Sequence, residues 1–93
     1  MAGFTTISST QLSGTGDVFA GSARVKSIWI AHSATAGTVV LRDGGSTGTV
    51  RCTLNTAAVL GEYQSDIPEP GIKCSNPHIT IGGGVSFVTV FYD

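Results

Sequence analysis

The sequence predicts an all-β fold, a small antiparallel β-sandwich or jelly roll of about eight short strands. Short β-branched segments recur along the whole chain and are separated by glycine- and proline-rich turns. No segment is long enough to supply the crossover helices that a parallel sheet needs. Hydrophobic residues make up 41% of the 93 residues, enough for one core, so we expect a single domain over residues 1–93. Residues 1–20 are expected to form an extended N-terminal arm of this domain.

The first half of the chain predicts four strands, at Phe4–Thr10, Ala23–His32, Gly37–Asp43 and Thr49–Asn55. Their side chains are mostly β-branched or apolar, which suits a pleated and half-buried surface. A turn at Gly14–Gly16 separates the first two strands. The segment Gly44–Gly48 holds three glycines between two β-branched strands, and this pattern predicts a hairpin.

The second half predicts four more strands, at Glu62–Ile67, Ile72–Ser75, His78–Ile81 and Val85–Tyr92. Turns at Pro68–Gly71 and Asn76–Pro77 separate the first three. The three glycines at Gly82–Gly84 are expected to turn the chain between the last two strands, which would then pair. Helix is limited at most to Thr56–Leu60, a segment too short to be stable as an isolated helix.

The long predicted strands carry apolar residues on both faces, whereas each strand of a simple sandwich buries only one face. On Ala23–His32, alternation places Val25 and Trp29 on one face. The opposite face of that strand carries Ile28 and Ile30. The closing strand shows two apolar stripes, which are Val88, Val90 and Tyr92 on one face and Val85, Phe87 and Phe91 on the other.

Two explanations of these second apolar faces remain open. In the first, loops and the N-terminal segment of the same chain cover these faces. In the second, another chain covers them. Charged residues make up only 12% of the sequence, and because charges are depleted at interface cores, this favours the second explanation. We therefore expect a homo-oligomer whose subunits meet along Val85–Tyr92. The residues expected in the core or at a subunit interface are Trp29, Ile28, Ile30, Val88, Val90 and Tyr92.

Charge balance and hydropathy argue against two classes of partner. Five basic and six acidic residues give a net charge of −1, without the basic excess typical of nucleic-acid binding. The longest apolar run, Ile28–Ala31, is far shorter than the roughly 20 residues of a membrane-spanning helix. The first residues lack the basic segment and apolar run of a signal peptide. We therefore expect Cys52 and Cys74 to be free thiols.

We assign no catalytic, metal-binding or cofactor-binding residues from the sequence. His32 and His78 lie on separate predicted strands, and the chain lacks the Gly-x-Ser-x-Gly pattern of a hydrolase nucleophile. Asp43 before two glycines is better explained as a turn than as the start of a calcium loop. A carbohydrate-binding platform of exposed aromatic rings stays open. The position of Trp29 between two isoleucines favours the core or an interface over such a platform.

The chain resembles small β-sandwich structural proteins of tailed bacteriophage particles, which are decoration (cement) proteins or short head and tail components. The segments that carry the resemblance are Val25–His32, Thr35–Gly45, Pro70–Ile72 and Gly83–Tyr92. The resemblance implies a virion protein, made in the cytoplasm of the host bacterium, that has no enzymatic activity and no cofactor. It further implies a homo-oligomer, often a trimer, bound to the lattice of the major capsid protein.

The expected function is therefore that of a capsid decoration protein that stabilises the head by bridging capsomers. Two alternatives remain open. The first is a tail, fibre or head–tail joining component of the same kind of particle. The second is a small carbohydrate-binding module. The expected partners are further copies of this chain and the capsid lattice, with no nucleic acid and no membrane.

Overall fold

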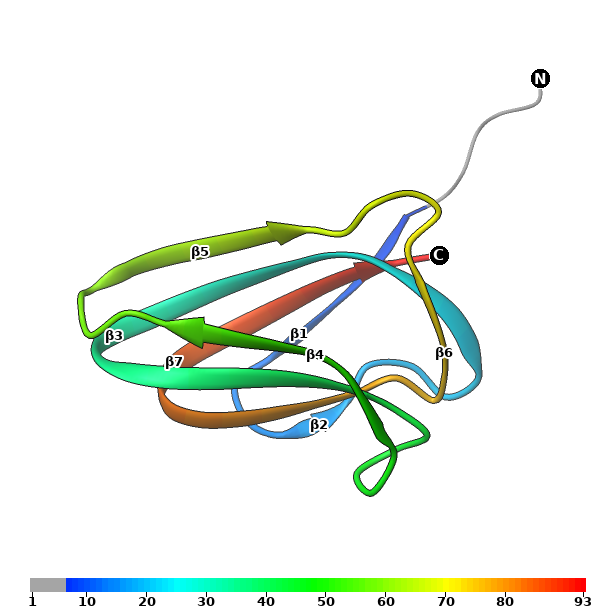
Figure 1. Cartoon of the computed structure of the whole chain (residues 1–93), viewed down its shortest axis with the longest axis horizontal. Helices are drawn as coiled ribbons and strands as arrows, with labels where there is room; N and C mark the ends of the chain where they lie inside the picture. Colours follow the sequence, from blue (N-terminus) through cyan, green and yellow to red (C-terminus); the bar gives the residue numbers. More distant parts are fainter. Residues whose placement is uncertain (1–6) are drawn as a thin grey trace.

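Two long strands, β3 (Ser22–Asp43) and β7 (His78–Tyr92), organise the whole fold (Figure 1). The computed structural model describes residues 7–93. The other strands are β1 (Ser8–Leu12), β2 (Gly16–Asp17), β4 (Thr49–Thr56), β5 (Gly61–Asp66) and β6 (Ile72–Ser75). All seven strands belong to one antiparallel sheet, and residues 7–93 contain no helix. The all-β prediction is confirmed.

The local elements follow the turn chemistry of the sequence. Gly44–Gly48 connects β3 to β4 as the predicted hairpin, and Asp43 pairs with Thr49. The segment Ala57–Leu60, where a short helix was allowed, is a bend between β4 and β5. Of the predicted Phe4–Thr10 strand, residues 4–6 lie outside the described residues, and Ser8–Thr10 belong to β1. Both β1 and β2, within the expected N-terminal arm, pair with β7.

The prediction of a turn at Gly82–Gly84 is wrong. These glycines lie inside β7, which joins the two last predicted strands, and β3 likewise joins Ala23–His32 to Gly37–Asp43. The two strands stay paired on both sides of the glycines, with His32 opposite Val85 and Gly37 opposite Gly83. Gly83 has φ +70°, and a Cβ on it would lie 2.7 Å from the Gly37 Cα. The glycines therefore let two paired strands bend together at close range, instead of reversing one strand.

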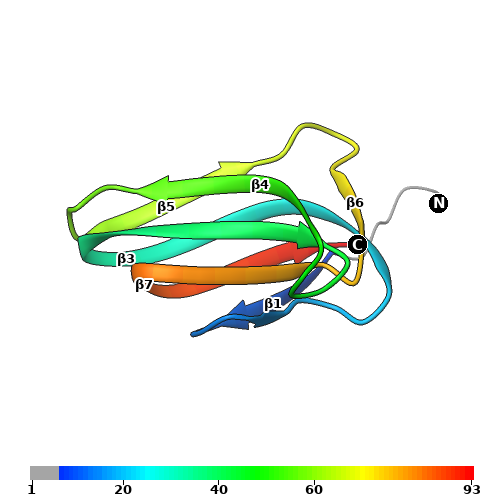
Figure 2. The same cartoon turned by 60° about the horizontal axis from the view of Figure 1, so that its bottom comes forward.

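Because β3 and β7 bend together, the sheet folds back on itself. Both strands run to one end of the molecule and return in Figure 1. One half of the sheet has the order β1, β7, β3, β5, and the other half joins β2 and β4 to the remaining parts of β7 and β3. Figure 2 shows β4 and β5 along one side of the molecule and β1 along the other, with β3 and β7 between them.

The core lies between the two halves of the folded sheet. The first half contributes Val25, Ile28, Ile30, Val88 and Val90, and the second contributes Val39, Leu41, Leu54 and Ile79. All of these side chains are buried and form a single cluster. At about 25 cal/mol per Å² of buried apolar surface, this cluster is the main source of stability.

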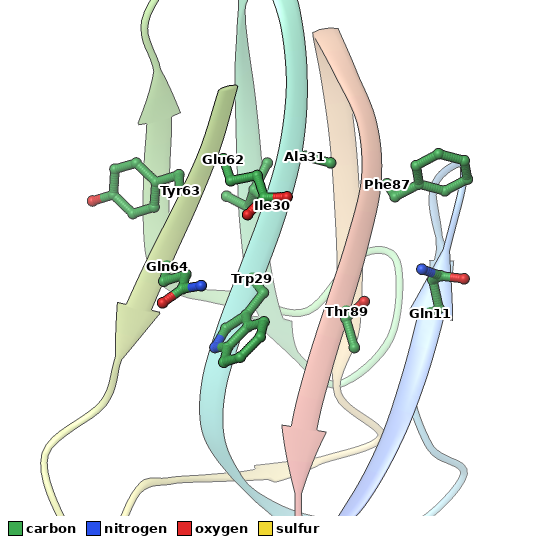
Figure 3. Close-up of a pocket in the computed structure, with 9 residues that line it drawn as sticks. All are labelled: Gln11, Trp29, Ile30, Ala31, Glu62, Tyr63, Gln64, Phe87 and Thr89. Atoms are coloured by element: carbon green, nitrogen blue, oxygen red, sulfur yellow. The ribbon is translucent and has the colours of Figure 1, made fainter. Parts of the chain in front are cut away.

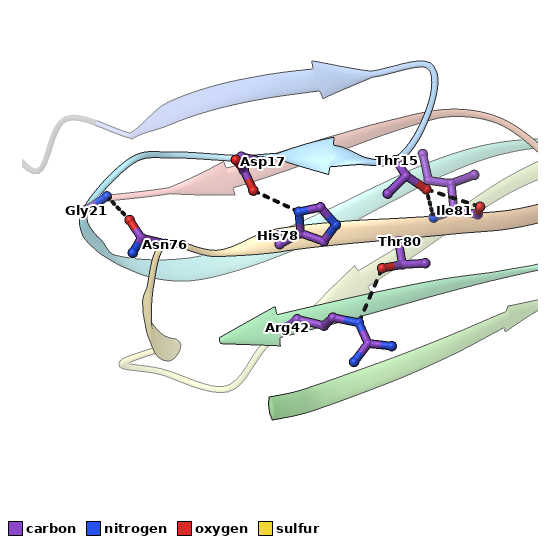
Figure 4. Close-up of polar contacts among 8 residues, drawn as sticks. All are labelled: Thr15, Asp17, Gly21, Arg42, Asn76, His78, Thr80 and Ile81. Carbon is purple, nitrogen blue, oxygen red and sulfur yellow. Dashed lines mark hydrogen bonds and ion pairs between the residues drawn. The ribbon is translucent and has the colours of Figure 1, made fainter. Parts of the chain in front are cut away.

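Polar contacts fasten the segment around β2 to β7 (Figure 4). His78 Nδ1 lies 2.8 Å from Asp17 Oδ1, and the Ile81 amide donates to Thr15 Oγ1 at 2.9 Å. At the start of β3, the Gly21 amide donates to Asn76 Oδ1 at 2.8 Å. These bonds hold the N-terminal strands against the sheet although their registers with β7 are short.

Candidate functional site

The structure separates the residues that were expected in the core or at an interface. Ile28, Ile30, Val88 and Val90 are at most 1% exposed and lie in the core. Tyr92 is partly buried against that core, and its ring lies 5.4 Å from the ring of Phe19. Trp29 is 44% exposed, so it is not a core residue. The stripe of Val88 and Val90, expected at a subunit joint, therefore packs inside the chain.

A β-bulge explains why strict side-chain alternation grouped Val25 with Trp29 instead of with Ile28 and Ile30. Val25 pairs with Tyr92 and Ser27 with Phe91, so Lys26 is an extra residue in β3. The bulge shifts the alternation by one position. Val25 consequently joins Ile28 and Ile30 inside, and Trp29 projects outward.

The outward side chains of the β1–β7–β3–β5 half form a surface that we call the aromatic face. Its middle row follows the register across four strands, in the order Gln64, Trp29, Thr89 and Gln11. A neighbouring row contains Glu62, Ala31 and Phe87, and the row on the other side contains Asp66, Ser27 and Phe91. Figure 3 shows the first two rows side by side. The face thus combines three aromatic rings with amides, hydroxyls and two carboxylates.

The indole of Trp29 is held in one orientation. Its Nε1 donates a hydrogen bond to Ser27 Oγ at 2.9 Å, and Ser27 Oγ donates to Asp66 Oδ1 at 3.0 Å. The ring of Phe91 packs edge-on against the indole, with centroids 5.1 Å apart. These contacts fix the ring while leaving much of its surface exposed to solvent.

An open hollow of about 240 Å³ lies on the aromatic face beside Trp29 (Figure 3). It is lined by Gln11, Trp29, Ile30, Ala31, Glu62, Tyr63, Gln64, Phe87 and Thr89. None of these nine residues is Lys, Arg or His. Apolar surface with a few convergent polar groups is typical of a small-molecule binding site. Of these nine residues the sequence pattern singled out only Trp29, Ile30 and Phe87, because strand pairing across distant segments brings the others together.

A second feature is the end of the molecule at which β3 and β7 bend. Three segments meet there, because His32 pairs with Gly61 and Val85, and Gly37 pairs with Thr56 and Gly83. The segments are residues 32–38, 56–61 and 82–86, and they contain no Asp, Glu, Lys or Arg. We call this surface the uncharged end. Val59 and Leu60 project from it with 63% and 77% of their surface exposed.

The histidines and cysteines are distributed over four strands, β3, β4, β6 and β7. Within residues 7–93 no group of three or more His, Cys, Asp or Glu side chains is placed to hold a metal ion. His32 lies at the uncharged end, whereas His78 pairs with Asp17 beside β2. Cys52 and Cys74 are free thiols, and burial raises the pKa of each. No helix in the described part of the chain is long and apolar enough to cross a membrane.

Comparisons with protein-family models, with curated proteins and with solved structures found no match to this chain.

Proposed function

We propose that the protein is a non-enzymatic structural protein of a bacteriophage particle, which decorates the capsid and stabilises the head by bridging capsomers. The resemblance of Val25–His32 and Gly83–Tyr92 to such proteins is the starting point of this proposal. The observation that supports it best is the uncharged end, with its exposed Val59 and Leu60.

The uncharged end has the chemistry of a protein contact. Charged residues are depleted at the centres of protein interfaces because their desolvation is costly. All eleven charged residues lie outside the three segments of this end, and Glu62 is the single one that directly follows one of them in the chain. Burying exposed apolar side chains contributes about 25 cal/mol per Å², and repetition over a lattice makes many weak contacts act together. The uncharged end is therefore the surface that meets the capsid.

The proposal includes a homo-oligomer that acts on the lattice of the major capsid protein, and the resemblance to decoration proteins implies a trimer. Closed rings of identical subunits are the usual way to cover apolar surface that one chain leaves exposed. The face of β7 that carries Val88 and Val90 is filled from within the chain, so it is no longer available for this contact.

The test uses particles of the phage that encodes the chain. The protein should copurify with capsids at a fixed number of copies per major capsid subunit. Recombinant protein should rebind stripped capsids until the sites saturate, which sedimentation and quantitative gel densitometry measure. Val59→Asp should weaken this rebinding at least tenfold, because it places a charge in the contact.

Val50→Asp is the matched control. Val50 is also an exposed valine, at 46%, but it lies on β4 near the opposite end of the molecule. The Val50→Asp variant should rebind capsids as well as the wild-type protein does. A few copies that fractionate with tails would assign the protein to the tail, fibre or head–tail joint instead. Absence from purified particles would overturn the structural function altogether.

A further inference from the structure

The aromatic face carries a feature that attachment through the uncharged end does not use. Trp29 presents an exposed indole in the open hollow, and Ser27 and Phe91 hold the ring in place. A large ring that is already ordered loses little conformational entropy when a ligand packs against it. The arrangement is therefore preorganised for binding.

Polar groups surround the indole at positions set by the strand register. Gln64 and Thr89 are its direct neighbours on either side, and Gln11 lies beyond Thr89. Glu62 lies in the next row on the strand that carries Gln64. None of the hydrogen bonds found among residues 7–93 engages the side chain of Gln11, Gln64 or Glu62. Their donors and acceptors face the hollow, open to a ligand (Figure 3).

The charged residues of the aromatic face narrow the class of ligand that it can bind. The hollow is lined by one carboxylate, that of Glu62, and by no basic residue, and Asp66 lies in the next row of the aromatic face. This charge disfavours a polyanion such as a nucleic acid, which binds mainly through basic side chains. An apolar protein surface would leave the two amides and the carboxylate buried without partners, at a cost of about 1–3 kcal/mol for each group.

A neutral sugar matches both the indole and the polar side chains of the aromatic face. The C–H bonds on one face of a pyranose ring carry partial positive charge and pack against the negative face of the indole. Its hydroxyl groups both donate and accept, so they match the amides of Gln11 and Gln64 and the carboxylate of Glu62. We propose that the aromatic face is a binding site for neutral oligosaccharide, centred on Trp29, in addition to the structural function and independent of it.

The test exploits Trp29 as the single tryptophan of the chain. The purified full chain is titrated with neutral hexasaccharides of glucose, mannose, galactose and N-acetylglucosamine, while the indole emission is recorded. We expect a saturable emission change with at least one of them. Gln64→Ala should weaken binding about tenfold, because it removes hydrogen bonds but no core contact. Trp29→Ala, followed by calorimetry instead of fluorescence, should abolish it.

Phe19→Ala is the matched control, since Phe19 is an aromatic residue with similar exposure, 40%, that does not line the hollow. It should bind the sugar like the wild-type chain. Gln64→Ala keeps the test decisive even if Trp29→Ala fails to fold. Binding of sulfated but not neutral oligosaccharides would overturn the proposal, as would no binding at millimolar concentration. An oligomer that Trp29→Ala dissociates would also overturn it and assign the face to a second copy of the chain.

Discussion

Trp29 and Ile30 are neighbours in the sequence and have opposite environments in the fold. Ile30 is 1% exposed within the core, whereas Trp29 faces the hollow. Successive side chains of a strand point to opposite faces, so the difference follows once the register is set. The size of a side chain is therefore a poor guide to its contribution to stability here.

We predict that Ile30→Ala destabilises the fold more than Trp29→Ala does. Removing a buried isoleucine side chain costs about 2–5 kcal/mol, because it leaves a cavity in the core. Truncating Trp29 loses its contacts with Ser27 and Phe91 but opens no cavity inside the protein. Urea denaturation followed by circular dichroism measures both free energies of unfolding. A larger loss for Trp29→Ala would mean that the indole is buried against something in solution.

The two thiols should make the free energy of unfolding depend on pH. Burial raises the pKa of Cys52 and Cys74, and the nearby carboxylate of Asp43 raises the pKa of Cys74 further. The unfolded chain therefore loses its thiol protons at lower pH than the folded chain does. As the pH rises through about 8.5, the unfolded state binds fewer protons, so the free energy of unfolding should fall. Denaturation curves between about pH 7 and 9.5 measure this slope.

A Cys52→Ala, Cys74→Ala double variant is the control for that slope and should flatten it. Alkylation provides an independent check. Two thiols should be modified in non-reducing denaturant, and Cys74, which is 1% exposed, should react more slowly than Cys52 in the native protein. A protein that is two mass units lighter and cannot be alkylated would contradict the assignment of free thiols.

At the scale of the elements, the joint bend of β3 and β7 determines the architecture. Without it, the two strands would form one long flat ribbon with no enclosed core. The bend brings the backbones very close, since a Cβ on Gly37 would lie 2.7 Å from the Gly82 carbonyl oxygen. Side chains are therefore excluded from part of the bend.

We predict that Gly84→Ala and Gly82→Ala differ sharply. A Cβ on Gly84 would collide with the Thr35 carbonyl oxygen and would lie 2.6 Å from Ser33 Oγ, so strain of about 2 kcal/mol or more is expected. A Cβ on Gly82 would meet nothing within 4 Å. Gly82→Ala should therefore leave the melting temperature unchanged or raise it slightly, because the unfolded chain loses freedom. Equal effects in calorimetry would show that the bend is looser than described.

At the scale of the whole molecule, two exposed surfaces differ in charge: the uncharged end has no charged residue, whereas the aromatic face carries Glu62 and Asp66. The two surfaces adjoin at Glu62 and Phe87 but are built from different residues. The uncharged end can therefore contact a particle while the indole of Trp29, one row further along the strands, stays open to solvent. Under the proposed function, light scattering should give a mass near three times 9.5 kDa. Trp29→Ala should keep that mass. A wild-type monomer at high micromolar concentration would show that the chain meets its neighbours only on the capsid.

The Val88→Asp variant tests whether Val88 belongs to the core or to a subunit contact. Val88 is fully buried between the two halves of the sheet, so an aspartate there would carry an unpaired charge into the core. We expect the variant to unfold, as measured by circular dichroism and gel filtration. A folded monomer would instead place Val88 at a subunit contact, the outcome that the alternation pattern alone favoured.

The sequence alone predicted the all-β class, the hairpin at Gly44–Gly48, and the approximate positions of β4, β5 and β6. These features are local, because strand propensity and turn chemistry depend on neighbouring residues. It also singled out Trp29, but it could not place that side chain on the correct face.

Which face of each long strand is buried depends on the tertiary fold. One extra residue, Lys26, reverses the alternation along β3, and the glycines at 82–84 continue a strand where they were expected to end it. Both outcomes depend on the partner strand, which comes from a distant part of the sequence. The aromatic face arises in the same way, since Gln11, Trp29, Gln64 and Thr89 meet only through the pairing of four strands. Because the side-chain period of a strand is two, a shift of one residue exchanges inside and outside, and local sequence does not encode that shift.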